Sequence, residues 1–176
     1  SDTVYTRDDL NLPKNAFIYA SFCSIVKITP PMFDLWMEIL KQVPNSVLWL
    51  KKGPDESVAN LIKEAKARGV SEARLVFAEN IPSHSEYMRV LGMADLFLDT
   101  WPFSAHATCS DAIWSGVPVI SFMGESFPAR VSSSVLYAAW LPELITKTKE
   151  DFVNLAVELG RNPAKLRVIK SKLERN

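Results

Sequence analysis

The sequence has few cysteines and no long apolar run. Its 176 residues include two cysteines, Cys23 and Cys109, which stand far apart and outside any CxxC motif. This usage excludes a disulfide scaffold and gives little support to a redox or zinc site. No apolar run approaches the roughly 18 residues that span a bilayer, and the opening SDTVYTRDDLNLPKN lacks the apolar core of a signal peptide. We therefore expect a cytoplasmic protein with free thiols.

Net charge is also absent, since 20 Lys and Arg residues balance 20 Asp and Glu residues. The charge balance therefore does not point to nucleic acid or to an anionic membrane as the main partner. A hydrophobic content of 48% is ample for one core. We predict one compact domain over 15–176, preceded in 1–14 by a linker or by the end of another domain.

Several catalytic and nucleotide-binding motifs are missing. The first expected crossover, SFCSIVKITPP, has no glycine, which argues against a GxGxxG dinucleotide site and against a GxxxxGK phosphate loop. The chain has no DxD pair that would hold Mg²⁺ against a nucleotide diphosphate. No paired carboxylates or Ser/His/Asp arrangement follow the expected strands, so nothing indicates hydrolysis. We expect neither a metal nor a cofactor.

Short apolar runs alternate with helical patterns along the chain. Because the runs are apolar throughout, they predict strands that are buried on both faces, and the alternation with helices predicts parallel pairing. The expected fold class is α/β, with a doubly wound, mostly parallel, Rossmann-like sheet. We expect strands in 16–22, 46–51, 73–78, 95–99 and 117–122, and helices in 32–43, 58–65, 83–94, 106–116, 126–140, 149–160 and 163–174.

Two loops of this fold carry candidate ligand-binding residues. In doubly wound sheets, ligands bind outside the carboxyl ends of the strands, where the strand order reverses. Lys27 follows the first strand, although a single loop lysine is as readily a solvated surface charge. After another strand, Tyr87 and Arg89 begin a helix, where a ring can stack on a base and a guanidinium can hydrogen-bond to it. The local pattern alone favours the alternative, in which Tyr87 packs in the core and Arg89 is an exposed charge.

The stretch LFLDTWPFSAHATCSDAIW gives the strongest signal. A strand ends at Asp99, and a helix begins near His106 or Ala107. Helix amino termini bind anions, and His106 and Thr108 add side-chain donors there. Asp111 lies one turn further on and is placed to accept a hydrogen bond from a ribose hydroxyl. Thr108 and Asp111 also have the spacing of a capping box, so this alternative stays open.

Three long stretches of the chain closely resemble the O-GlcNAc transferase family, which includes SPINDLY-type protein O-fucosyltransferases and many bacterial relatives. The similarity covers nearly all of 12–175 and keeps the family's order and spacing. It implies the C-terminal, nucleotide-sugar-binding half of a GT-B glycosyltransferase. The stretches are LPKNAFIYASFCSIVKITPPMFDLWMEILKQVPNSVLWL, DLFLDTWPFSAHATCSDAIWSGVPVISFMGESFPARVSSSVL and LPELITKTKEDFVNLAVELGRNP.

The resemblance assigns roles to the candidate residues. It implies that Lys27 contacts the diphosphate and supports the leaving nucleotide. It also implies that His106 and Thr108 hold the phosphates with the helix amino terminus, that Asp111 holds the ribose, and that Tyr87 lies against the base.

Three positions depart from the family pattern. Ser24 stands where animal enzymes have Gln, and Ala107 stands where many members have Thr. Val90 stands where an Arg that contacts uracil is found, with Arg89 adjacent. UDP-GlcNAc and GDP-fucose therefore both stay open as donors.

We hypothesise that the chain is the donor-binding domain of an inverting, metal-independent protein O-glycosyltransferase that transfers GlcNAc from UDP-GlcNAc to Ser or Thr. The alternatives are a GDP-fucose-using SPINDLY-type enzyme and a non-catalytic nucleotide- or partner-binding module. The resemblance also implies an N-terminal catalytic half and tetratricopeptide repeats, which this chain does not contain. We expect the basic last helix, from Lys165 to Arg175, to pack on that half rather than on a membrane.

Overall fold

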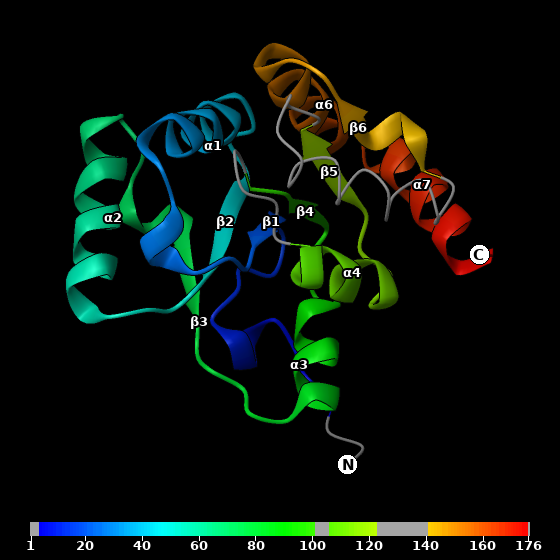
Figure 1. Ribbon diagram of the computed structural model, residues 1–176, viewed down its shortest axis with the longest axis horizontal. Coiled ribbons are helices and arrows are strands. Elements are labelled where there is room, and N and C mark those ends of the chain that lie inside the picture. The colour runs from blue at the N-terminus through cyan, green and yellow to red at the C-terminus, as the bar shows by residue number, and fades with distance from the viewer. Residues whose placement is uncertain (1–3, 101–105, 123–140, 176) are drawn as a thin grey trace.

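The computed structural model describes residues 4–100, 106–122 and 141–175, with all side chains in these ranges except those of 106–109 and 175. Within these residues, parallel strands form a sheet in the order β3-β2-β1-β4-β5-β6 (Figure 1). The pairing confirms the predicted doubly wound fold class. The strands are β1 (Phe17–Ser21), β2 (Ser46–Lys51), β3 (Leu75–Ala78), β4 (Leu96–Leu98), β5 (Val119–Phe122) and β6 (Ile145–Thr146).

The central strands are buried on both faces, as their uninterrupted apolar runs predict. All residues of β4 and β5 are buried, and in β1 and β2 only Phe17 and Lys51 are not. The two-residue strand β6 was not expected, because two residues are too few to form a recognisable pattern.

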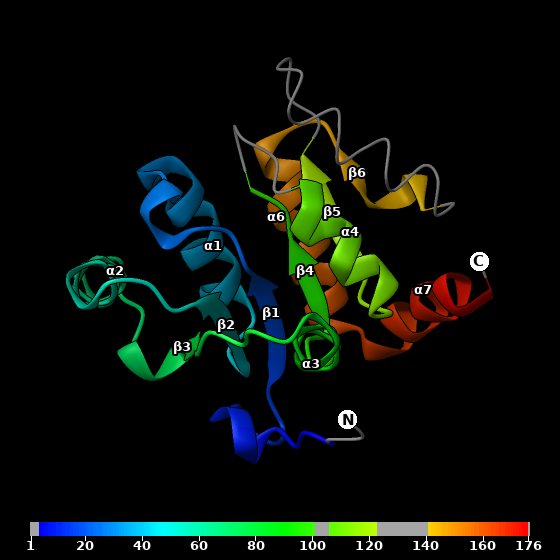
Figure 2. The same ribbon diagram turned by 60° about the horizontal axis from the view of Figure 1, so that its bottom comes forward.

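Helices cover both faces of the sheet. The α-helices are α1 (Pro30–Gln42), α2 (Asp55–Ala67), α3 (His84–Leu91), α4 (His106–Trp114), α6 (Lys149–Arg161) and α7 (Pro163–Arg175). Single 3₁₀ turns are η1 (Asp8–Leu10), η2 (Ile25–Lys27), η3 (Glu72–Arg74) and η4 (Pro142–Leu144). Helices α1 and α6 pack together on one side, whereas α3 and α4 lie together on the other (Figures 1 and 2). The helix expected near 126–140 lies outside the described residues.

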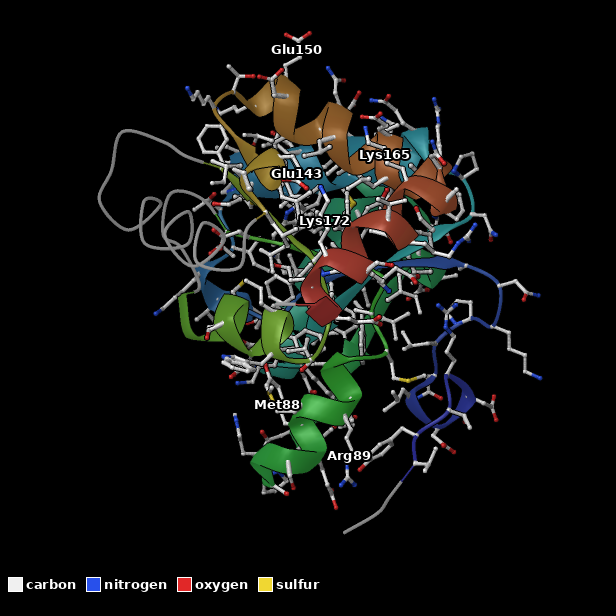
Figure 3. The ribbon with its side chains drawn as sticks, turned by 90° about the vertical axis from the view of Figure 1, so that its right-hand side faces the viewer. Met88, Arg89, Glu143, Glu150, Lys165 and Lys172 are labelled. Carbon is white, nitrogen blue, oxygen red and sulfur yellow. The ribbon has the colours of Figure 1, made fainter. Side chains whose placement is uncertain are left out.

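Local signals in the sequence place the helix ends. The Thr29 hydroxyl accepts a hydrogen bond from the amide of Met32, and Pro30 occupies the first position of α1. The chain leaves α2 through Gly69, whose φ of +81° belongs to the left-handed region that glycine adopts without strain. At the other end of the chain, Lys172 of α7 pairs with Glu143 of η4 at 2.9 Å (Figure 3). None of the helices in the described part of the chain is long and apolar enough to cross a bilayer.

The segment before β1 packs on the domain. The Arg7 guanidinium pairs with Asp95 at 3.2 Å and donates to the carbonyl oxygens of Pro13, Lys14 and Ala16. Leu12 is buried in the core. The expectation that 1–14 ends a preceding domain stays a prediction.

Candidate functional site

The strand order reverses between β1 and β4. From β1 the chain proceeds outward to β2 and β3, and then returns to pair β4 with the other side of β1, through Tyr19 opposite Leu96. The two strand ends are tied together, since the Ser21 hydroxyl donates to the carbonyl oxygen of Leu98 at 2.8 Å. The carboxyl edge of β1 and β4 is therefore where a ligand is expected.

The loop after β1 presents Ser24 and Lys27 at this edge. Both residues are exposed, and the carbonyl oxygen of Ser24 accepts a hydrogen bond of 2.9 Å from the amide of Lys27. The turn η2 is anchored by Ile25, which is buried and contacts the backbone at Gly53 so closely that a Cβ there would overlap it. Because Gly53 has no side chain, Ile25 can pack closely against it, and this contact holds the turn that carries Lys27.

Cys23 shows that the ends of β1 and β4 share one electrostatic environment. Burial raises the pKa of its thiol to about 11, and a hydrogen bond with Ser21 opposes this shift. The Asp99 carboxylate also raises the pKa of Cys23, whereas the Lys27 ammonium lowers it. Asp99 at the end of β4 and Lys27 in the loop after β1 therefore both affect the pKa of the Cys23 thiol.

Helix α4 begins where the sequence predicts, at His106. Asp99, at the end of β4, is fully buried, and its Oδ1 accepts a hydrogen bond from the amide of Thr100 at 2.8 Å. His106, Ala107 and Thr108 form the first turn of α4, and their side chains lie outside the described part. Because Thr108 lies inside the helix rather than before it, the capping-box alternative is disfavoured.

Asp111 faces the start of α3. Its Oδ1 lies 3.9 Å from Nε2 of His84, an exposed residue that the sequence analysis did not single out. Tyr87, one turn along α3, has its pKa raised to about 12, first by burial and second by the charge of Asp111. The structure therefore brings two predicted site residues, Asp111 and Tyr87, close to one another.

A cavity of about 160 Å³ opens at the carboxyl edge beside Tyr87. Phe22 and Tyr87 face each other with ring centroids 6.2 Å apart. The cavity is smaller than the roughly 300–1,000 Å³ typical of drug-sized ligand pockets, so it suits a single ring system. Its lining residues are Phe22, Lys51, Ala78, Glu79, Asn80, Ile81, Tyr87 and Val90.

Arg89 lies on a different face of α3. It lines a groove of about 690 Å³ together with Val4, Tyr5, Met88 and Trp114, and Figure 3 shows it beside the amino-terminal segment. Residues two apart on a helix do not share a face, because each residue turns the helix by about 100°. The predicted base contact of Arg89 stays a prediction, and its position does not bring it to the cavity of Tyr87.

The arrangement suits an anionic ligand that carries an aromatic ring. The ring would enter the cavity that Phe22 and Tyr87 line, and its anionic groups would meet Lys27 and the first turn of α4. In the part of the chain that the structure describes, no three His, Cys, Asp or Glu side chains are grouped to hold a metal ion.

Comparison with known proteins gives consistent matches. The profile of glycosyl transferase family 41 matches residues 1–176. The "UDP-N-acetylglucosamine--peptide N-acetylglucosaminyltransferase" of Caenorhabditis elegans is 35% identical over 168 residues, which are 96% of this chain and 14% of that protein. A barley (Hordeum vulgare) protein of the same description, termed probable and named SPINDLY, is 29% identical over 163 residues, 90% of this chain and 17% of that one.

A solved structure agrees. A mutant of the O-GlcNAc transferase of Thermobaculum terrenum superposes with a TM-score of 0.86 at 30% identity, covering 91% of this chain and 31% of that one. The chain thus spans a small part of the proteins that it matches.

Proposed function

The chain belongs to glycosyl transferase family 41, and from this premise we propose that it is the donor-binding half of a protein O-glycosyltransferase. In this proposal, the longer parent enzyme transfers GlcNAc from UDP-GlcNAc to Ser or Thr hydroxyls, with inversion and without a metal. The fold, the C-terminal half of a GT-B glycosyltransferase, is the half expected to bind the nucleotide sugar.

The observation that carries the proposal is the shared position of three features. The cavity of Phe22 and Tyr87, the turn bearing Lys27 and the first turn of α4 all lie at the carboxyl edge of the sheet, around its switch point. A nucleotide sugar needs an aromatic pocket for its base and positive groups for its diphosphate. An aromatic pocket and positive groups both lie at the carboxyl edge of this sheet.

The proposed reaction is a displacement at the anomeric carbon. The acceptor hydroxyl attacks, the bond between that carbon and the diphosphate oxygen breaks, and the proton passes to a base on the N-terminal half. Negative charge then develops on the diphosphate. A preorganised donor at such a position typically contributes about 3–4 kcal/mol in the transition state. Lys27 would stabilise this charge with the amino terminus of α4, which is the role a metal would otherwise have.

Each remaining site residue except Arg89, which lines the groove, has a role in the proposal. Tyr87 would stack on the base and Asp111 would hold the ribose. His106 and Thr108 would donate to the phosphates, with Ala107 between them in the same turn. Ser24 would line the approach to the diphosphate from the loop after β1.

The proposal includes partners outside this chain. These are the N-terminal catalytic half, the tetratricopeptide repeats and a cytoplasmic protein acceptor. A transfer assay on the parent protein tests the proposal: incorporation of GlcNAc from UDP-GlcNAc into a protein acceptor, in the presence of EDTA, is the expected result. Nucleotide binding without transfer of either GlcNAc or fucose would instead favour the non-catalytic module.

A further inference from the structure

We propose that Lys51 reads the base of the nucleotide and selects a base with a keto oxygen, as in uracil or guanine, over one with an amino group, as in cytosine or adenine. This inference rests on the proposed function, because it assumes that the cavity beside Tyr87 holds a nucleotide base.

The walls of the cavity differ in what they offer to a ligand. Phe22 and Tyr87 contribute rings, and Val90 contributes an aliphatic wall and is itself buried. None of the three side chains offers a charge to the edge of a base. The charged groups come from the opposite side, where β2 and β3 end and where Lys51 pairs in register with Ala78.

Lys51 is a charged residue of this wall that has no ion-pair partner among the described residues. Lys52, its neighbour, pairs through Nζ with Oε1 of Glu79 at 3.2 Å, so these two charges neutralise each other. Within the residues that the structure describes, the Lys51 side chain makes no ion pair or hydrogen bond, and it is exposed at the cavity. Its ammonium group is therefore available to a ligand.

The hydrogen-bonding capacity of an ammonium group determines which bases Lys51 would prefer. A lysine offers three donors and no acceptor, so it matches the keto oxygen of uracil or guanine and opposes the amino group of cytosine or adenine. The Asn80 amide at the cavity both donates and accepts, and so has no preference of this kind. Arg89 lines the groove on the other face of α3.

The test measures the ratio of two affinities. UDP and CDP have the same ring size and the same diphosphate, and differ at the carbon that bears the keto or the amino group. GDP and ADP form a second pair that differs there too. Binding of each nucleotide is titrated by calorimetry to this chain and to the parent protein. The variants are Lys51→Met, Lys51→Glu and, as a matched control, Lys63→Met on the exposed surface of α2.

The wild-type protein should prefer UDP over CDP, or GDP over ADP, by roughly tenfold, the worth of one charge-assisted hydrogen bond at an exposed site. Lys51→Met should remove this preference, Lys51→Glu should reverse it, and Lys63→Met should keep it. Because Lys51 is exposed at a strand end, all variants should keep the melting temperature of the wild type.

The two failures are distinguishable. Equal affinities within both pairs in the wild type, or a preference that survives in Lys51→Met, would overturn the role of Lys51 and leave nucleotide binding intact. No binding of any nucleotide, to the chain or to the parent, would overturn the proposed function and this inference together.

Discussion

The two faces of α3 line two hollows that differ in size and in position relative to the sheet. One face, with Tyr87 and Val90, lines the small cavity at the carboxyl edge, opposite Phe22 and Lys51. The other, with Met88 and Arg89, lines a groove more than four times larger, about 690 against 160 Å³.

The larger groove is not the better candidate for the ligand. It lies away from the switch point of the sheet, whereas the smaller cavity combines facing rings with the loops at the carboxyl edge. Position relative to the topology, rather than size, therefore makes the smaller cavity our candidate for the ligand site.

The largest contrast should appear in turnover. Lys27→Ala in the parent enzyme should lower kcat by about 100- to 1,000-fold, because the developing charge of the diphosphate loses a preorganised donor. Donor affinity should fall much less. Arg89→Ala, on the groove side, should change kcat by less than about twofold. Steady-state kinetics of both variants measures this, and an unchanged kcat for Lys27→Ala would remove Lys27 from the mechanism.

The next contrast is in nucleotide affinity. Tyr87→Ala should weaken UDP or GDP binding by about 10- to 100-fold, as expected for the loss of one aromatic stacking partner. Met88→Ala, one residue on and facing the groove, should leave binding unchanged. Calorimetric titration compares the two, and equal losses would show that α3 acts through its stability rather than through one face.

Alanine substitutions at Gly53 and Gly92 can be compared directly, because each adds one methyl group to the backbone. Gly53→Ala forces a Cβ against the β-branched, buried side chain of Ile25, so the turn that carries Lys27 must move. Turnover of the parent should fall by about tenfold, because a small displacement of a catalytic group is costly. Gly92→Ala, on the groove side, meets its nearest atoms at 3.4 Å and should be tolerated. Tenfold loss in both variants would contradict the assignment.

The smallest effect should appear at alkaline pH. The pKa of the Cys23 thiol is raised from 9.0 to about 11, so the folded chain holds this proton more tightly than the unfolded chain does. The corresponding stability is present below pH 9 and is lost as the pH rises toward 11. Denaturant titrations from pH 8 to 11 should show a shallower decline for Cys23→Ala than for the wild type. Parallel curves would mean that burial does not perturb this thiol.

The fold was predictable because its signals are local and strong. Apolar runs without alternation indicated buried parallel strands, and Thr29 and Gly69 marked helix ends. The start of α4 at His106 followed from the same kind of signal. What could not be predicted depends on contacts between distant segments: Lys51 ends an apolar strand, and only the pairing of β2 with β3 brings it to the cavity.

Arg89 is a different case. Its separation from Tyr87 follows from helical rotation alone, so a helical projection of SHSEYMRV would have placed Tyr87 with Val90 and Arg89 elsewhere. The sequence does not single out His84, because its partner, Asp111, comes from another helix.

The most direct test asks which face of α3 the base occupies. Uniformly labelled protein is saturated with UDP or GDP, and nuclear Overhauser effects are recorded from the base protons to assigned aromatic side chains. We expect contacts to the rings of Tyr87 and Phe22. Contacts to Tyr5 or Trp114 would instead place the base in the groove and contradict the assignment of the cavity.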